Sequence, residues 1–488
     1  TPYDMRIKRK GAVDTMLDLF LKEFEALCRI PRPSGHEEAV CRYLMGRLRD
    51  MGLSPVADGT YNLVCDVPPT EGIPPTPPLA LQAHIDMVCV GAKDYSPEND
   101  PIHTVIRDGW LCSDGRSTLG ADCGAGVAAM MALLSGGLPH GALRLIFTAD
   151  EEMGLVGARQ MDPSVVQDCV GLINLDGFHG NRAVISSAGG YRLIFRKTCL
   201  TFPSMLDQAF RIRISGLRGG HSGDDIGEGR ANAARLLLWL LQSIEVPWDL
   251  GEINARGTFN VIRTEASAVI AVGREDQDQL QAVISMFAQG ISDLYRETDP
   301  DIQITVEPTD MPQVFPTDAR DDLLALAGII PCGVDRMHPI CPDCVGSSGN
   351  LASLWAQAGE MELRSFLRSC SNDYLDEHGA YYRSAGRSFG FTEEEMRYPA
   401  WPGEEHNPMA KRCIEIAARQ GREMTIGAVH AGLETSVFHA FRPDMPVISL
   451  GGDVLDPHTV LERLGLQSAL NLMELMREMI LPLNHTLN

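Results

Sequence analysis

Residues 79–88 read Leu-Ala-Leu-Gln-Ala-His-Ile-Asp-Met-Val, an apolar run that ends in a histidine and an aspartate. Such a short apolar run is typical of a strand buried in a sheet. Because side chains alternate along a strand, His84 and Asp86 are expected on the same face. A carboxylate beside a metal-bound imidazole accepts its second N–H and raises its basicity. The motif alone is also compatible with an ordinary strand end that carries a His–Asp hydrogen bond.

The sequence around this strand alternates between helical and strand patterns. Apolar residues at three- and four-residue spacing predict helices, and short apolar runs predict further strands. Strands that alternate with helices indicate an α/β domain with a largely buried sheet. The helices are predicted over 16–31, 37–52 and 125–134, and the strands over 62–67, 79–85, 143–147 and 172–175.

From about residue 190 the strands alternate polar and apolar residues, which is typical of antiparallel strands with one solvated face. This segment is expected to form an α+β domain. No internal repeat is visible in the sequence. Strands are predicted over 211–215, 258–262 and 268–272, with helices over 231–242 and 277–294.

A Pro/Gly-rich linker at 398–408 ends this segment, and an α/β pattern resumes with a helix over 409–420 and a strand over 447–450. We therefore expect an α/β domain over 1–187 and 397–488, interrupted by an inserted α+β domain over 188–396.

The composition limits the protein's partners and location. The 488 residues include 42 Lys+Arg and 65 Asp+Glu, a net charge of −23 that disfavours binding to nucleic acid. No run approaches the ~20 apolar residues of a membrane helix. Residues 1–10 are polar and basic and lack the apolar core of a signal peptide. Thirteen scattered cysteines fit reduced thiols, so we expect a cytoplasmic protein that binds neither nucleic acid nor membrane.

Further acids fall at strand ends or in a glycine-rich turn. Asp122 lies in Gly-Ala-Asp-Cys-Gly-Ala-Gly, where a helix N-cap is the alternative interpretation. Glu151 and Glu152 belong to an Asp-Glu-Glu run whose charges repel unless a cation or proton offsets them. A solvated acidic turn would also explain this run. Asp176 ends the next apolar strand.

A second histidine, His458, follows the strand at 447–450 and a Gly-Gly turn. The two histidines and the carboxylates thus gather at strand ends of one α/β domain, where such sheets place their sites. Mixed histidine and carboxylate ligands suit zinc or a similar divalent ion. The carboxylates exceed the need of one tetrahedral site, which indicates two metals ~3.5–4 Å apart that share one acid.

The ordered motifs AHIDMV, TLGADCGAG, DEEMGLVGA, NLDG, GGHSGDDI and HAGLE resemble the co-catalytic di-zinc aminoacylase/dipeptidase family, and within it the aminoacyl-histidine dipeptidases. The resemblance extends from about residue 15 to the C-terminus. It implies a zinc-peptidase-like catalytic domain with a mixed sheet flanked by helices, and an inserted lid domain through which a homodimer forms. It also implies hydrolysis of dipeptides, Xaa-His among them, at two divalent ions, with Zn first and Mn or Co as alternatives.

The resemblance assigns roles to individual residues. Asp122 would bridge the two metals, and Asp86 would orient His84. Glu151 would be the general base that takes a proton from a metal-bridging water and delivers it to the leaving amine. The implied metal ligands are His84, Asp122, Glu152, Asp176 and His458.

The resemblance also places residues of the inserted domain and beyond it at the substrate. His221, in Gly-Gly-His-Ser-Gly, would stabilise the oxyanion, whereas a histidine among glycines is also typical of a turn. Arg368 would clamp a substrate carboxylate, and Glu434 would pair with the substrate ammonium. Solvated or structural roles stay open for all four substrate-binding candidates, which are Asn260, Arg368, His430 and Glu434.

The sequence departs from the family pattern at three places, of which the first two bear more on substrate preference than on catalysis. Thr459-Val460 follows His458 in place of Ser-Pro, Gly451-Gly452-Asp453 replaces Gly-Pro-Thr, and Cys123 stands where Asn is usual.

A separate group of thiols and one histidine could form a small zinc site, but its compact, irregular spacing favours a loop without metal. The group consists of Cys332, His338, Cys341 and Cys344.

Two alternative functions remain open. One is an amidohydrolase of N-acyl amino acids that uses the same two metals. The other is a metal-dependent peptide-binding protein without catalysis, which the intact Glu151 disfavours.

Overall fold

The computed structural model describes residues 15–482, so the basic segment at residues 1–10 lies outside the described part of the chain. No helix within 15–482 is long and apolar enough to cross a membrane. The thirteen cysteines all lie in this range, and none of them forms a disulfide bond.

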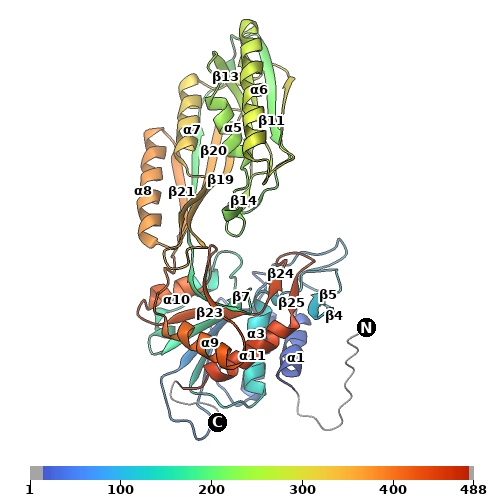
Figure 1. The fold of residues 1–488 in the computed structure, drawn as a ribbon, viewed down its shortest axis with the longest axis vertical. Coiled ribbons are helices and arrows are strands. Elements are labelled where there is room, and N and C mark those ends of the chain that lie inside the picture. Colours follow the sequence, from blue (N-terminus) through green and yellow to red (C-terminus); the bar gives the residue numbers. More distant parts are fainter. Residues whose placement is uncertain (1–14, 483–488) are drawn as a thin grey trace. The chain divides into compact units, whose positions relative to one another are not determined.

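The described chain divides into two compact units, which are described separately below (Figure 1). The first unit comprises the residues up to Ile185, Glu404–Gly427 and the residues from Leu433. The second unit comprises Ser186–Gly403 and Ala428–Gly432.

The first unit is built on an eight-stranded mixed sheet of order β1-β2-β6-β3-β7-β23-β8-β22. Its central strands β6 (Leu143–Thr148), β3 (Leu79–His84), β7 (Gly171–Gly177) and β23 (Val447–Gly451) run parallel. They are buried along nearly their whole length, which explains their continuous apolar sequence. Because parallel strands end at one edge, the residues that follow them lie close together.

Helices and outer strands complete this unit. Helix α3 packs on β3 and β7, while α9, α10 and α11 pack on β23. The outer strands are β1 (Val56–Ala57), β2 (Leu63–Val67), β8 (Arg182–Ser187) and β22 (Thr425–Val429). The helices are α1 (Met16–Cys28), α2 (Glu38–Asp50), α3 (Ala121–Ser135), α4 (Val156–Gln160), α9 (Pro408–Arg419), α10 (Thr435–Phe441) and α11 (Leu466–Met479).

The first unit also contains a separate four-stranded sheet of order β24-β25-β5-β4. The loop between β24 (Val454–Leu455) and β25 (Arg463–Gly465) contains His458. Strand β25 pairs with β5 (Trp110–Ser113), which pairs with β4 (Thr104–Arg107), so this loop is attached to the segment that leads into α3.

The second unit contains a nine-stranded antiparallel sheet that shares one apolar core with four helices (Figure 1). The helices are α5 (Ala233–Gln242), α6 (Gln277–Leu294), α7 (Thr317–Ile329) and α8 (Asn372–Ser388). The sheet strands are β9 (Gly189–Thr198), β11 (Gln208–Ser215), β13 (Trp248–Ala255), β15 (Ala266–Val272), β16 (Gln303–Pro308), β18 (Gly333–Met337), β19 (Val345–Gln357), β20 (Glu360–Ser369) and β21 (Thr392–Tyr398). Two short pairs are β10 (Phe202–Pro203) with β17 (Gln313–Val314) and β12 (Gly220–His221) with β14 (Val261–Ile262).

The order of the sheet, β16-β11-β15-β13-β19-β20-β9-β21, contains a repeat that the sequence does not show. The elements β11, α5, β13, β15, α6 and β16 form a βαββαβ unit with strand order 4-1-3-2. The elements β9, α7, β19, β20, α8 and β21 have the same order when the sheet is read from its other edge. The two copies meet where β13 pairs with β19, so one chain supplies both halves of the sheet.

One predicted strand is wrong in extent. The strand expected over 258–262 is reduced to β14, because the preceding residues form a turn in which Val261 N donates to Thr258 O at 3.3 Å.

The units also differ from the predicted domain boundary near residue 397. Residues 397–403 belong to the second unit, because Tyr398 ends β21 and pairs with Gly190 of β9. The short segment Ala428–Gly432 likewise belongs to the second unit.

The close approach of α3 to β7 depends on Gly126, where a Cβ would lie 2.4 Å from the carbonyl oxygen of Leu175. We expect Gly126→Ala to lower the free energy of unfolding by about 1–3 kcal/mol in urea titrations, since backbone must move. Gly46→Ala in α2 is the matched control, because a Cβ at this position would meet nothing within 4 Å. That control should raise stability by about 1 kcal/mol through helix propensity. Equal effects of the two substitutions would contradict the packing argument.

Candidate metal centre

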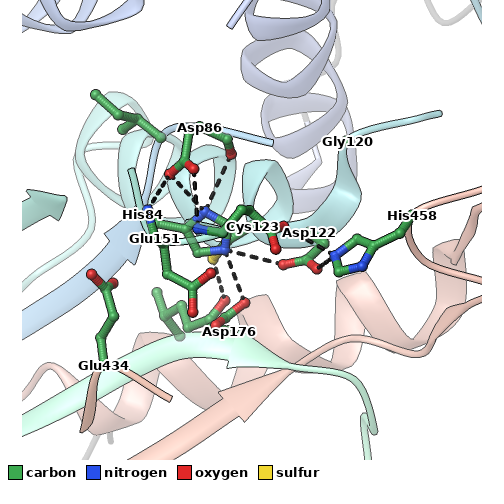
Figure 2. A network of polar contacts seen from close by, with 12 residues as sticks. His84, Asp86, Gly120, Asp122, Cys123, Glu151, Asp176, Glu434 and His458 are labelled. Atoms are coloured by element: carbon green, nitrogen blue, oxygen red, sulfur yellow. Dashed lines mark hydrogen bonds and ion pairs between the residues drawn. The ribbon is translucent and has the colours of Figure 1, made fainter. Parts of the chain in front are cut away.

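His84, the last residue of β3, is surrounded by carboxylates (Figure 2). Its side chain is 1% exposed, and its Nε2 lies 3.1 Å from Asp122 Oδ1 and 3.5 Å from Asp176 Oδ1. Its Nδ1 lies 3.4 Å from Asp86 Oδ1 and 3.2 Å from the Asp86 carbonyl oxygen. Both ring nitrogens therefore face acceptor oxygens. If a metal ion took the Nε2 lone pair, the remaining ring proton would lie on Nδ1, toward Asp86.

Asp122 lies between the two histidines (Figure 2). Its Oδ2 is 2.9 Å from His458 Nε2, which is also 3.0 Å from Glu152 Oε1. Each oxygen of Asp122 thus faces a different imidazole. The N-cap interpretation of Asp122 is wrong, because the N-cap residue of α3 is Gly120 and the oxygens of Asp122 face His84 and His458.

The centre stabilises positive charge. Burial lowers the pKa of His84, but the carboxylates of Asp176 and Asp122 outweigh burial and raise this pKa well above its ordinary value. The pKa of His458 is raised to about 11, because Asp122 and Glu152 outweigh the effect of burial. Burial raises the pKa of Asp176 to about 7. A cation that displaced these protons would meet the same negative field.

Two overlapping groups of donor atoms could hold a divalent ion. His84, Asp122 and Glu152 offer ligand atoms within 4.8 Å of one another, and so do His84, Cys123 and Asp176. Asp176 Oδ1 is buried and has no hydrogen-bond partner among residues 15–482. Nitrogen and carboxylate donors suit zinc, manganese or cobalt. Cys123, which departs from the family pattern, lies beside this set and donates its thiol to Leu175 O at 3.2 Å.

Asp86 connects the histidine to the acidic run. It is fully buried, and its carboxylate accepts hydrogen bonds from Glu151 N at 3.0 Å, Glu152 N at 3.2 Å and Ser34 Oγ at 2.8 Å. Burial would raise the pKa of Asp86, but these bonds and His84 lower it. Asp86 therefore holds both the imidazole and the backbone that aims the two glutamates.

Glu151 and Glu152 do not form a solvated turn. The side chain of Glu152 is 10% exposed and contacts His458. Burial raises the pKa of Glu151 well above its ordinary value, and the charges of Glu152, Asp176 and Glu434 raise it further. A carboxyl group with a raised pKa beside ligand side chains suits proton transfer near neutral pH.

Glu434, also in the first unit and labelled in Figure 2, has one oxygen with hydrogen-bond partners and one without. Its Oε2 accepts from Gln82 Nε2 at 2.5 Å and Thr148 Oγ1 at 2.6 Å. Its Oε1 is buried without a hydrogen-bond partner in the described part of the chain. Burial raises the pKa of this carboxyl to about 7. An unpartnered buried acceptor is costly, so a donor or cation that fits beside it gains affinity.

The second unit brings the other candidates near one another. His221 Nδ1 lies 3.0 Å from Asp224 Oδ2, and a Cβ on Gly223 would contact both His221 and the backbone of His430. Asn260 has an exposed side chain, but its carbonyl accepts from Ser222 N at 2.8 Å and so supports the His221 turn.

Arg368 and His430 are buried and incompletely paired. Arg368 is 4% exposed and its guanidinium lies 4.2 Å from the centre of the Phe366 ring. His430 Nε2 lies 2.7 Å from Ser348 Oγ. Burial and the Arg368 charge lower the pKa of His430 to about 3, so its imidazole is neutral. Within 15–482, Arg368 Nε and His430 Nδ1 have no hydrogen-bond partner.

The segment with Cys332, Cys341 and Cys344 has the features of a loop. His338 Nδ1 accepts from the backbone N–H groups of Ile340 and Cys341, and its Nε2 lies 2.9 Å from Ser186 Oγ. Both ring nitrogens therefore have protein partners.

Sequence reasoning missed two buried charges beside the centre, Arg32 and Glu462. Both contact backbone groups of the ligand-bearing segments, and neither belongs to a motif with metal-ligand chemistry. The one available signal was the position of Glu462 four residues after His458.

Comparison with known proteins gives related sequences and structures. The sequence pattern of peptidase family M20/M25/M40 matches residues 80–481. The cytosol non-specific dipeptidase of Escherichia coli (strain K12) is 28% identical over 475 residues, which cover 94% of this chain and 96% of that protein. The crystal structure of aminoacylhistidine dipeptidase from Vibrio alginolyticus superposes with a TM-score of 0.84 and 26% identity, covering 94% and 95% of the two chains. Aminopeptidase PepT from Bacillus cereus ATCC 10987 shares the fold at a TM-score of 0.55 and 17% identity, covering 96% and 99%.

We expect zinc or manganese to stabilise the metal-depleted protein, because the buried acids attract cations only when folded. At a free metal concentration about 100 times Kd, the gain is about 2.7 kcal/mol, visible as a rise in Tm by differential scanning calorimetry. Asp122→Asn should remove most of this rise. Asp162→Asn, an exposed acid that caps the 3₁₀ helix Pro163–Val166, should retain it. An undiminished rise in Asp122→Asn would contradict the assignment of Asp122 as a ligand.

Proposed function

The chain belongs to peptidase family M20/M25/M40, and we propose that it hydrolyses the peptide bond of dipeptides at a centre of two divalent metal ions. The observation that carries this proposal is Asp122, whose two oxygens face His84 and His458 within 3.1 Å. The dipeptidases of Escherichia coli and Vibrio alginolyticus match this chain over 94% of its length.

We assign the metal ligands as His84 and Asp176 on one ion, Glu152 and His458 on the other, and Asp122 on both. Two divalent ions, with zinc as the first choice and manganese or cobalt as alternatives, would polarise the scissile carbonyl and acidify the attacking water. Asp86 keeps the ring proton of His84 on Nδ1.

Glu151 is the proposed proton carrier. Its buried carboxylate takes a proton from the attacking water and delivers it to the nitrogen of the leaving amino acid. The backbone hydrogen bond from Glu151 N to Asp86 supports this role, since it fixes the start of the side chain relative to His84.

Glu434 favours a dipeptidase over an amidohydrolase of N-acyl amino acids. A dipeptide carries a free ammonium group that can donate to the unused Oε1 of Glu434. An N-acyl substrate has no cation at that position. The proposed role of Glu434 is therefore to bind the N-terminus of the substrate.

The second unit is proposed to act as a lid that supplies substrate-binding groups. Arg368 would bind the substrate carboxylate with its planar guanidinium, Asn260 and His430 would contact the substrate, and His221 would stabilise the oxyanion. His221→Ala tests the last role, because it should lower kcat without loss of metal. An unchanged kcat would make His221 a turn residue only.

Location and assembly are proposals of the same kind. Thirteen cysteines outside disulfide bonds and the similarity to the cytosol non-specific dipeptidase of Escherichia coli support a cytoplasmic enzyme. The homodimer implied by the family resemblance stays a prediction, which sedimentation of the purified chain would test. A preference for Xaa-His dipeptides is supported by the aminoacylhistidine dipeptidase of Vibrio alginolyticus.

A panel of dipeptides, including Xaa-His, and N-acyl amino acids should show turnover of the dipeptides. Glu434→Gln should raise KM for dipeptides at least about tenfold, because a charge-assisted bond to the ammonium is worth roughly 1.5–3 kcal/mol. Turnover of N-acyl amino acids alone would overturn the dipeptidase assignment. No turnover of either set by the metal-loaded protein would leave the peptide-binding alternative.

Glu151→Gln and Glu152→Gln make a matched pair, since the same chemical change falls on adjacent residues. Glu151→Gln should lower kcat by about 10²–10⁴-fold while metal content stays at the wild-type level, because a proton carrier is lost. Glu152→Gln should lower metal content, because a ligand oxygen is lost. Metal analysis and steady-state kinetics on the same samples separate the two effects. Retained activity in Glu151→Gln would place the base elsewhere.

A further inference from the structure

Glu462 is a buried carboxylate that binds only backbone groups of the segment leading to Asp122. It is 2% exposed. Its Oε2 accepts hydrogen bonds from Leu119 N and Gly120 N, both at 2.9 Å, and its Oε1 accepts from Asp122 N at 3.2 Å. Three N–H groups converge on one carboxylate, a pattern that fixes the local backbone strongly. Because Glu462 lies in the loop between β24 and β25 with His458, this contact also ties that loop to Asp122.

Arg32 holds the same segment from the other side. It is also 2% exposed and lies between α1 and α2. Its Nη2 donates to Gly120 O at 2.6 Å, and its Nη1 donates to the carbonyls of Ile85 and Asp86 at 3.1 Å each. The fork of one guanidinium thus joins the end of β3, where His84 lies, to the segment that carries Asp122.

Both charged side chains bind Gly120: its N–H donates to Glu462, and its C=O accepts from Arg32. Its φ of +71° is left-handed. A Cβ there would lie 2.6 Å from Met87 Sδ and 2.7 Å from Arg32 Nη2. Glycine suits this position because it has no Cβ that would disfavour the left-handed conformation or collide with Met87 and Arg32. The hydrogen bonds of Glu462 and Arg32 to Gly120 therefore have a fixed geometry.

We propose that Arg32 and Glu462 are positioning residues that set the distance between His84, Asp122 and His458, and thereby the affinity of the centre for its second metal ion. This inference rests on the proposed two-metal function. In the described part of the chain, these hydrogen bonds join both side chains to backbone groups and not to side-chain oxygens or nitrogens of the proposed ligands. They act through the backbone of three ligand-bearing segments, and such outer contacts commonly change metal affinity by 10–100-fold.

Glu462→Gln is the sharpest test, because it preserves volume but turns one acceptor oxygen into an N–H donor that faces backbone N–H groups. Zinc alone is titrated into the metal-depleted full chain in competition with a chromophoric chelator. The expected result is a Kd for the second ion about 10–100-fold weaker than in the wild type. The absorption spectrum of the cobalt-loaded protein should also change, since the geometry at Asp122 changes.

Glu23→Gln is the matched control. Glu23 is likewise a buried acid of the first unit, at 3% exposed, but it bonds to Arg47 and Ser135. Glu23→Gln should leave both dissociation constants for zinc and the absorption spectrum of the cobalt-loaded protein as in the wild type, even if it changes the stability measured in urea. A role of Glu462 in stability alone would likewise leave both zinc constants within about twofold of wild type, and that result overturns the inference.

Arg32→Lys serves as a second variant if Glu462→Gln does not fold. A lysine keeps the charge but has one nitrogen, which cannot span the carbonyls of Ile85, Asp86 and Gly120. Arg32→Lys should weaken binding of the second zinc ion by a similar factor. Unchanged dissociation constants for zinc would overturn the inference. If the wild-type chain binds fewer than two zinc ions, the proposed function itself fails. The two failures are therefore distinguishable.

Discussion

The carboxylate of Asp122, with one imidazole facing each oxygen, is the arrangement on which the rest of the first unit depends. His84 and His458 approach it from β3 and from the loop after β24, segments far apart in the sequence. Several acids buried in one place repel each other and lose hydration, so they persist only with nearby positive charge and hydrogen bonds. The parallel sheet supplies the common edge, and Asp86, Arg32 and Glu462 supply the hydrogen bonds that hold the loops there.

A network of hydrogen-bonded polar side chains inside the sheet supports the candidate metal centre. Asn174 Nδ2 donates to Gln82 Oε1 at 2.7 Å, and Gln82 in turn donates to Glu434. Asn174 Oδ1 accepts from Ser449 Oγ at 2.6 Å and from Asp176 N at 3.2 Å. These side chains are fully buried, and the network connects β3, β7 and β23. Hydrogen bonds are strong in a low-dielectric core, so this network holds the ammonium-binding candidate Glu434 and the candidate ligand Asp176 at fixed positions.

The second unit follows a different principle, that of a repeated topology. Two βαββαβ copies meet at β13 and β19, yet the sequence shows no repeat. This is because a copy is defined by strand order and by which face is apolar, and many residues satisfy those conditions. The pairing closes the centre of the sheet within one chain and leaves β16 and β21 as its outer strands.

The sequence by itself determined the fold class and the family, and it predicted most residues of the candidate metal centre. The α/β pattern with an inserted α+β segment is confirmed by the family match and by the similar dipeptidase structure. Residues such as His84, Asp122 and Glu151 could be found because their chemistry is rare at strand ends and their spacing is local. Only the tertiary structure shows that the oxygens of Asp122 face both histidines and that one oxygen of Glu434 has no hydrogen-bond partner in the described part of the chain. It also shows that Arg32 and Glu462 both bind the backbone of Gly120. The hydrogen bonds of Glu462 join residues up to 343 positions apart through backbone groups, which every residue possesses, so no side-chain pattern predicts them.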